Sequence, residues 1–249
     1  MNVIDVGLHN VERTGFFCKM SQPKSAGYRR KLAWLERRFA EGLVIKMLDL
    51  TEGGRGFIEY IPGEHAWRAV EASGYLLIHC LWVVGKSQGQ GHATRLVEEC
   101  IEDARRQDRD GVAMLTSEGN WLLGEKFLAR RGFRPVASAP PSFTLMALRF
   151  GAAEPPSMPD DWDKRARRFG DGLTVVRTDQ CPYLDDATKN AVAGAAALGV
   201  PHRVVELTSA VEVRRRAPTP YGVFALVRDG ELLTYHYQTA KPLARLLTK

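Results

Sequence analysis

One short segment of the chain is built mainly from small and amide side chains, Gln88-Gly89-Gln90-Gly91-His92-Ala93. It lies between a buried apolar run and a stretch with helical periodicity. The first turn of a helix presents backbone N–H groups that have no partner within the helix, together with partial positive charge. Small side chains let an anion approach those donors. The segment therefore predicts a phosphate-binding loop, with a simple chain-reversing turn as the alternative. It is neither a G-x-G-x-x-G fingerprint nor a P-loop.

A second residue with chemical potential is Cys181, which lies in the sequence TDQCPYLDDA just before an expected helix. A helix N-terminus lowers the pKa of a nearby thiol, so Cys181 is a candidate reactive thiol. The remaining cysteines are Cys18, Cys80 and Cys100, and no two of the four form a C-x-x-C pair. This spacing favours reduced thiols over a disulfide framework or a zinc site, and we expect no metal site.

Helices and strands must position these residues. Leu32, Leu35 and Phe39 recur at three and four positions, which predicts an amphipathic helix over 28–41. Two further helices are predicted over 93–106 and 120–131. Strands are predicted at 43–50, 56–61, 74–84, 111–117 and 142–150. The run 74–84 is apolar at successive positions, as in a strand buried on both faces. The mixture indicates an α/β or α+β fold.

The chain changes composition at 151–171, a segment rich in Pro, Gly and charge that we interpret as a linker. After it, strands are expected at 173–177, 202–206, 223–227 and 232–237, with helices near 184–197, before 223 and at the C-terminus. This order, β-α-β-α-β-β-α, is the one expected of a small thioredoxin-like unit. We therefore predict two domains, 1–150 and 172–249.

The glycine loop, in its context, resembles motif A of the GNAT superfamily of acyl-CoA-dependent N-acyltransferases. That motif is Gln/Arg-x-x-Gly-x-Gly/Ala after a strand ending in L-x-V, and Gln88, Gly91 and Ala93 match it after 81–83. Downstream, the expected strand 111–117 and the Gly-Phe pair at 132–133 occur in the family's order. The resemblance covers 43–150 and implies a GNAT mixed sheet with flanking helices.

The resemblance implies acetyl-CoA as co-substrate. Backbone N–H groups of 88–93 would hold the CoA pyrophosphate, and the 81–83 backbone would bond the pantetheine arm as a strand does. An asparagine that opens the next helix in the family matches Asn120. The residues expected to bind the co-substrate are Leu81, Trp82, Val83, Gln88, Gly89, Gln90, Gly91, His92, Ala93 and Asn120.

Acetyl transfer to an amine needs a general base near the acceptor and is helped by an acid near the sulfur. His79 is a candidate base because histidine titrates near neutrality, and Glu59 is a second candidate, acting through water. The alternatives are a core histidine for His79 and a structural ion pair with Arg68 for Glu59. Many GNAT enzymes carry a tyrosine as the acid, but the matching positions here are Phe127 or Leu128.

The C-terminal part resembles a thioredoxin or glutaredoxin module. Cys181-Pro182-Tyr183-Leu184 is similar to the CPYC of glutaredoxins with the second cysteine replaced, and Thr219-Pro220 matches the position of a cis proline in that fold. The two-part layout is similar to that of the YoaP-type GNAT proteins. The missing resolving cysteine excludes dithiol chemistry within the module, and leaves a monothiol role, a binding site, or a packing and dimerisation role.

Charge and hydropathy limit the remaining classes. The net charge is +6, but no basic run is longer than the three residues 214–216, so we do not expect nucleic-acid binding. The apolar run 75–84 is half the length of a membrane helix, and no signal peptide is expected, which favours a cytoplasmic protein.

Together these features predict an N-acetyltransferase that transfers the acetyl group directly to an amine of a small molecule or protein. The alternatives are an acyl-CoA-binding sensor or scaffold with little catalysis, and a monothiol redox protein that uses Cys181. A homodimer is also left open.

Overall fold

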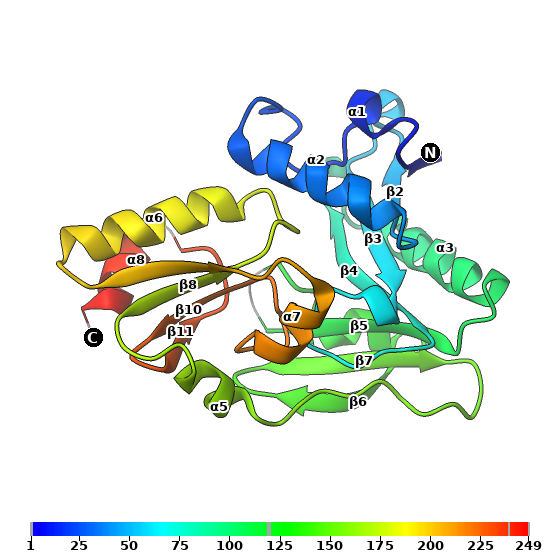
Figure 1. Cartoon of the computed structure of the whole chain (residues 1–249). Helices are drawn as coiled ribbons and strands as arrows, with labels where there is room; N and C mark the ends of the chain where they lie inside the picture. The colour runs from blue at the N-terminus through cyan, green and yellow to red at the C-terminus, as the bar shows by residue number, and fades with distance from the viewer. Residues whose placement is uncertain (1, 119–120, 239, 249) are drawn as a thin grey trace. The chain divides into compact units, whose positions relative to one another are not determined.

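The computed structural model describes residues 2–118, 121–238 and 240–248, the side chains of 240 and 241 excepted. The chain divides into two compact units. Unit 1 comprises Met1–Ser21, Leu32–Ala66 and Val70–Met158, and unit 2 comprises Gln22–Lys31, Trp67–Ala69 and Pro159–Lys249. Each unit has its own sheet (Figure 1).

The sheet of unit 1 has seven strands in the order β1-β2-β3-β4-β5-β7-β6. Neighbouring strands are antiparallel except β4 and β5, which are parallel. The strands are β1 (Val3–Val6), β2 (Val44–Leu48), β3 (Gly56–Pro62), β4 (Tyr75–Val83), β5 (Gly111–Ser117), β6 (Arg134–Ala139) and β7 (Phe143–Arg149).

Helix α3 (His92–Arg106) covers one face of this sheet. Its apolar stripe, with Leu96, Val97 and Cys100, is fully buried against residues of β3, β4 and β5. The other helices of this part of the chain are α1 (Val11–Thr14), α2 (Ala26–Phe39) and α4 (Glu125–Ala129), with 3-10 turns η1 (Leu50–Glu52), η2 (Gly63–His65) and η3 (Gly85–Ser87). The burial of an apolar helical stripe on a sheet is the main source of stability in such a layer.

A β-bulge interrupts the pairing of β3 with β4. Glu59 is opposite Cys80 and Tyr60 is opposite Ile78, so His79 is an extra residue of β4 between two register positions. The bulge changes the alternation of side chains, because Ile78 and Leu81 both enter the α3 core although they are three residues apart.

Beyond the bulge, β4 and β5 separate. Their parallel pairing runs from Tyr75↔Gly111 to Ile78↔Met114, and in the described strands it goes no further, although β4 continues to Val83 and β5 to Ser117. The two strands therefore open toward their C-terminal ends, where the glycine loop follows β4.

The sheet of unit 2 has the strand order β11-β10-β8-β9. Strands β8 and β9 are parallel, whereas β10 is antiparallel to both β8 and β11. The elements are α5 (Trp162–Arg167), β8 (Leu173–Arg177), α6 (Leu184–Ala197), β9 (His202–Glu206), α7 (Ala210–Arg216), β10 (Phe224–Arg228), β11 (Glu231–Thr234) and α8 (Ala240–Leu247). The segment expected to be a linker contains α5, whose Trp162 and Ala166 are buried.

Most predicted elements are confirmed, and the exceptions concern one helix, two strands and one proline. The helix expected over 120–131 contains only α4, and Trp121 has the left-handed φ of 56°, which a helix does not allow. Strands β1 and β6 were not predicted. Thr219-Pro220 was expected at a cis position, but among the described residues the cis bond is Pro140–Pro141.

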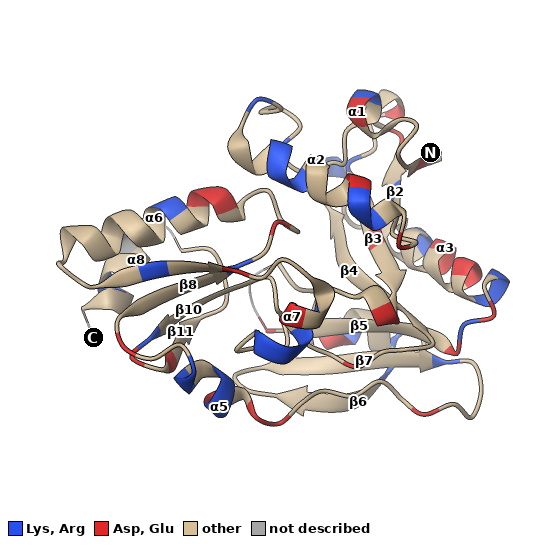
Figure 2. Ribbon diagram, in the orientation of Figure 1, with Lys and Arg blue, Asp and Glu red and all other residues tan. Residues whose placement is uncertain are grey.

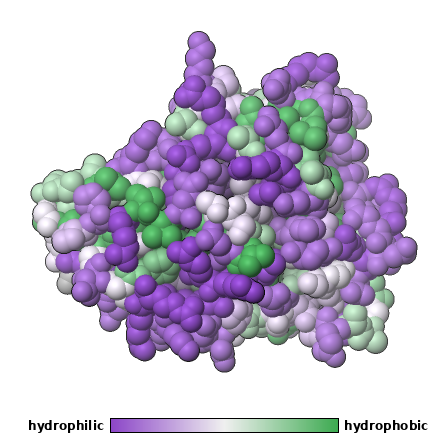
Figure 3. Space-filling model, viewed as in Figure 1, coloured by the Kyte–Doolittle hydropathy of each residue, from purple (hydrophilic) through white to green (hydrophobic). Residues whose placement is uncertain are grey.

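No described helix combines the length and the apolar character that a bilayer crossing requires. On the face of the molecule drawn in Figure 3, hydrophilic side chains dominate and apolar ones form small islands.

Candidate functional site

The backbone conformation of the loop between β4 and α3 depends on three glycines. Gly85, Gly89 and Gly91 have φ values of 60°, 74° and 80°, in the left-handed region that other residues rarely adopt. A Cβ built on any of the three would meet nothing within 4 Å. Glycine is therefore required here by backbone conformation, while the space above the loop is open to a ligand.

The same loop presents a row of hydrogen-bond donors. Within the described residues, the backbone N–H groups of 89–94 have no acceptor, and the first α3 turn contains no acidic residue. Nε2 of His92, the first residue of α3, is buried and has no partner in the described chain. Unpaired N–H donors at the positive end of a helix are suited to bind a phosphate group, so the residues of this loop fit the pyrophosphate of CoA.

Side chains of the loop hold its shape. Gln88 Nε2 donates to the carbonyl of Val83 at 3.0 Å, and Gln90 Nε2 donates to that of Lys86 at 2.5 Å. Ser87 is buried, and its Oγ accepts a hydrogen bond from the N–H of Arg55 at 3.0 Å. The two glutamines thus position the backbone, and Ser87 is a supporting residue that the sequence interpretation missed.

The end of β4 keeps one edge uncovered by β5, as the separation of the two strands requires. On its other edge, the pairs Ile58↔Leu81, Phe57↔Trp82 and Gly56↔Val83 hold it to β3. An extended chain such as pantetheine could take the place of β5 beside Leu81, Trp82 and Val83. Trp82 is 40% exposed, and Leu81 is buried in the α3 core.

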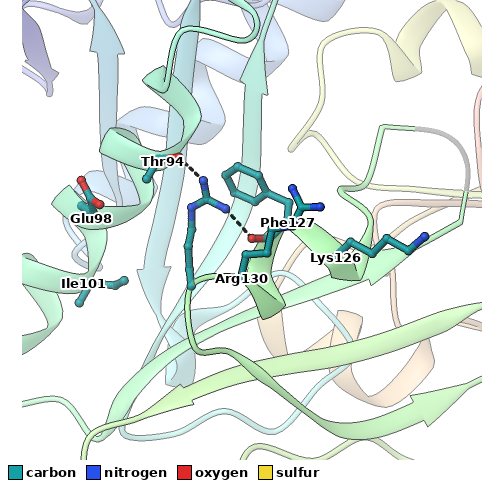
Figure 4. A pocket seen from close by; sticks show the side chains of 7 residues that line it. Thr94, Glu98, Ile101, Lys126, Phe127 and Arg130 are labelled. Carbon is teal, nitrogen blue, oxygen red and sulfur yellow. Dashed lines mark hydrogen bonds between the residues drawn. The ribbon is translucent and has the colours of Figure 1, made fainter.

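A cavity of about 760 Å³ lies between α3 and α4 (Figure 4). Thr94, Glu98 and Ile101 of α3 line it on one side. Lys126, Phe127 and Arg130 line the other side. Arg131 also belongs to the lining. The volume falls in the range of ordinary ligand pockets, and three cations give it a positive wall.

Arg131 joins the two helices at this cavity. One of its Nη atoms donates to Thr94 Oγ1, and the other donates to the carbonyl of Phe127 at 2.5 Å (Figure 4). Its guanidinium lies 3.5 Å from the centre of the Phe127 ring. Burial lowers the pKa of Arg131, because the charged form is partly removed from water.

His79 and Glu59 meet on the sheet face opposite α3. Nδ1 of His79 lies 3.3 Å from Oε1 of Glu59, and both side chains are almost fully buried. The ring of Trp34, in α2, lies 6.3 Å from the imidazole, centre to centre. His79 directly follows Ile78, whose side chain enters the α3 core, so its own side chain lies on the opposite face. A carboxylate at Nδ1 fixes the orientation of the imidazole, which directs proton exchange to Nε2.

The structure places no acid at the position of the family tyrosine. Phe127 lines the cavity, and Leu128 is buried in the core under α3. Neither side chain carries a proton that it can donate. Asn120, expected to bind the co-substrate, lies outside the described residues.

The acidic residue of η2, Glu64, is held by an ion pair. Glu64 is engaged by Arg109, whose Nη1 lies 2.7 Å from its Oε1. Partial burial alone would raise the pKa of Glu64, but the bond from Arg109 leaves that pKa below its usual value. The carboxylate is thus charged at neutral pH and already neutralised by an arginine.

Cys181 precedes α6 in unit 2 and is partly exposed. Its carbonyl accepts a hydrogen bond from the N–H of Leu184 at 3.2 Å. The first turn of α6 carries Asp185 and Asp186, visible as red at the start of that helix in Figure 2. The positive end of the helix favours a thiolate at this position, whereas the two negative carboxylates disfavour it.

Comparison with known proteins adds three findings. Residues 10–133 match the acetyltransferase (GNAT) family model. The chain is 30% identical over 251 residues to the uncharacterized N-acetyltransferase YoaP of Bacillus subtilis (strain 168), covering 99% of this chain and 98% of YoaP.

Solved structures with a similar fold include a GNAT-family acetyltransferase of Staphylococcus aureus Mu50, at 14% identity and a TM-score of 0.43, covering 59% of this chain and 99% of that one. The N-acetyltransferase YhbS of Escherichia coli, in complex with CoA, is 15% identical with a TM-score of 0.39, covering 60% and 81%. PaiA of Thermoplasma acidophilum, with coenzyme A, is 11% identical with a TM-score of 0.39, covering 60% and 100%.

Proposed function

Because the chain belongs to the GNAT family of acetyltransferases and is an acyltransferase, we propose that it transfers an acetyl group from acetyl-CoA directly to an amine. One observation carries the proposal at the level of residues. The N–H groups of 89–94 form a row of donors without acceptors in the described chain, at the start of α3 and below open space. Such a row is a binding site for a phosphate-bearing ligand.

Acetyl-CoA would supply an activated thioester, and the chain would supply binding and orientation. The loop 88–93 would hold the pyrophosphate, with Gln88 and Gln90 keeping its backbone in place. The uncovered edge at Leu81–Val83 would hold the pantetheine by backbone hydrogen bonds. The positive cavity between α3 and α4 adjoins the start of α3 through Thr94 and would favour the remaining phosphate charge.

The buried pair of His79 and Glu59 would remove the proton from the acceptor amine. An ammonium group must lose a proton before it attacks the thioester, and His79 is the base that we assign, with Glu59 holding its Nδ1 side. Both side chains are nearly inaccessible to solvent, so the amine reaches them through a water molecule or an adjustment of Trp34. For the leaving thiolate, Phe127 and Leu128 offer no proton.

The missing acid is the observation that favours a second function, an acyl-CoA-binding sensor with little catalysis. Both functions share the loop, and they differ in turnover. A thermal-shift measurement with acetyl-CoA tests the loop, and release of free CoA thiol with a panel of amines tests the transfer. Stabilisation together with amine-dependent release supports the enzyme. Stabilisation without release from any amine supports the sensor, and no stabilisation removes both.

We further propose that residues 1–150 and 172–249 are the two domains and that the second is thioredoxin-like. The strand order β11-β10-β8-β9, with β8 and β9 parallel, supports this assignment. A monothiol role for Cys181 is part of the proposal, as is a cytoplasmic location, which the scattered spacing of the four cysteines, without a C-x-x-C pair, supports.

A further inference from the structure

Unit 2 contains a cavity of about 250 Å³ that none of the sites above uses. Four arginines line it, contributed by α5 and the turn after it, by β9 and by the end of α7. Figure 2 shows Lys and Arg in blue on α5 and on part of α7. The lining residues are Arg165, Arg168, Phe169, Arg203, Val205 and Arg216.

Arg165 forms a rigid part of the wall. It is 7% exposed, its Nε donates to Asp161 Oδ1 at 2.6 Å, and its Nη1 donates to the carbonyl of Arg214 at 2.6 Å. The guanidinium also lies 5.0 Å from the centre of the Trp162 ring. Among the described residues, Nη2 of Arg165 has no acceptor. A buried guanidinium held in this way presents a donor at fixed geometry.

The other three arginines of the lining are exposed. Arg203 donates from Nη2 to the carbonyl of Phe169, which ties β9 to the end of α5. Arg216 pairs with Glu212 at 2.6 Å. The guanidinium of Arg168 has neither a hydrogen bond nor an ion pair with any residue that the structure describes.

The charges in the wall do not balance. Asp161 neutralises Arg165 and Glu212 neutralises Arg216, so the charges of Arg168 and Arg203 are left over in the described residues. Guanidinium groups around one small space repel each other unless an anion lies between them. Two uncompensated positive charges match a dianion, and the planar N–H forks of arginine match phosphate oxygens.

From this cluster, we propose that the cavity is a binding site for a small phosphate monoester. The volume lies below the range of about 300–1,000 Å³ for pockets that hold drug-sized ligands, so one phosphate group with a short organic body fills it. Phe169 and Val205 supply an apolar wall for that body. The site is separate from the glycine loop and independent of the proposed acetyl transfer.

Calorimetric titration of the full chain with inorganic phosphate and with glycerol 3-phosphate, at constant ionic strength, tests the proposal. We expect saturable binding of both, with the ester tighter because of the apolar wall. Arg168→Gln and Arg203→Gln should each weaken binding about tenfold, as expected for loss of one charge-assisted hydrogen bond. Arg215→Gln is the matched control: it removes the same charge from an exposed arginine outside the lining, and binding should change less than about twofold.

The glycine loop is a second place where phosphate could bind, so the titration is repeated on Gly91→Asp. Binding that persists there and is lost in Arg168→Gln assigns it to the cavity. Binding that is lost in Gly91→Asp but kept in the arginine variants overturns the proposal. Absence of saturable binding up to about 10 mM phosphate also overturns it, since the affinity would then be too weak for a built site. The same titration is carried out with a single-stranded oligonucleotide. If the oligonucleotide binds through these arginines and neither small phosphate binds, the proposal of a small phosphate monoester is wrong and the ligand is a polynucleotide.

Discussion

Substitution of Gly91 by aspartate is the sharpest probe of the glycine loop. Gly91 is the N-cap of α3, with φ of 80°, and a Cβ at this position points into open space. The change therefore adds a carboxylate at the mouth of the loop with no steric clash. Aspartate is among the residues that tolerate left-handed φ best.

The expected effect on affinity follows from the charge. A carboxylate on residue 91 would stand beside a pyrophosphate bound to the N–H groups of 89–94, and two unit charges separated by about 5 Å repel by about 3 kcal/mol at an effective dielectric constant of 20. This energy corresponds to about a hundredfold weaker binding of CoA. The protein should still fold, because an acid at a helix N-terminus contributes about 0.3–1 kcal/mol, which offsets part of the strain of about 1–3 kcal/mol from the left-handed backbone.

Gly53→Asp is a matched control for this substitution. Gly53 has φ of 78° and its Cβ would also meet nothing within 4 Å, so the backbone strain and the added charge are the same, but the site is the turn after η1. Isothermal titration with CoA and the melting temperature of the free protein are measured for both variants. Gly91→Asp should lose affinity and Gly53→Asp should keep it. CoA binding by Gly91→Asp within about threefold of the wild type would refute the loop assignment.

Four further predictions address other parts of the molecule. His79→Gln should lower kcat by about 10²–10⁴ while the Kd for acetyl-CoA stays unchanged; unaltered steady-state turnover would remove the general-base assignment. Arg131→Met should lower the free energy of unfolding by about 1–2 kcal/mol in urea titrations, because it removes the bonds between α3 and α4; equal midpoints would contradict that role. Burial lowers the pKa of His236, so the unfolded chain binds the proton first as the pH falls below about 6.5, and stability should decline toward pH 5. In His236→Gln the denaturant midpoint should fall less between neutral pH and pH 5 than in the wild type. An identical fall in both proteins would show that His236 is not the cause. Iodoacetamide should label Cys181 before Cys100, whose thiol is fully buried with its pKa raised well above the usual value; mass spectrometry showing equal rates would contradict the burial argument, and a Cys181 rate no faster than that of a peptide thiol would end the redox proposal.

Elements with a strong apolar pattern were predicted accurately. The strands at 111–117 and 173–177 have the bounds expected from the sequence, because nearly every residue in them is buried. The edge strands β1 and β6 were missed because an edge strand buries few side chains. In β6, only Ala139 is buried, and Pro135 lies within the strand.

The prediction of a helix over 120–131 was wrong for the first part of that range. Its apolar residues have helical spacing, but Trp121 takes a left-handed φ and the segment up to Gly124 is not helical. Periodicity records which residues are apolar and does not specify the backbone angles in a loop next to a cavity. Only α4, with Leu128 in the core, keeps the helical form.

The sequence by itself determined the family and the glycine loop, because both depend on residues close together in the chain. Gln88, Gly91 and Ala93 stand within six positions, and the helix that follows has its own apolar period. The tertiary structure decided everything that joins distant residues. The antiparallel pairing of β3 with β4 brings the imidazole of His79 to Glu59, twenty residues away. Likewise, Arg203 reaches the cavity of α5 only because β9 pairs with β8, a register that no local pattern encodes.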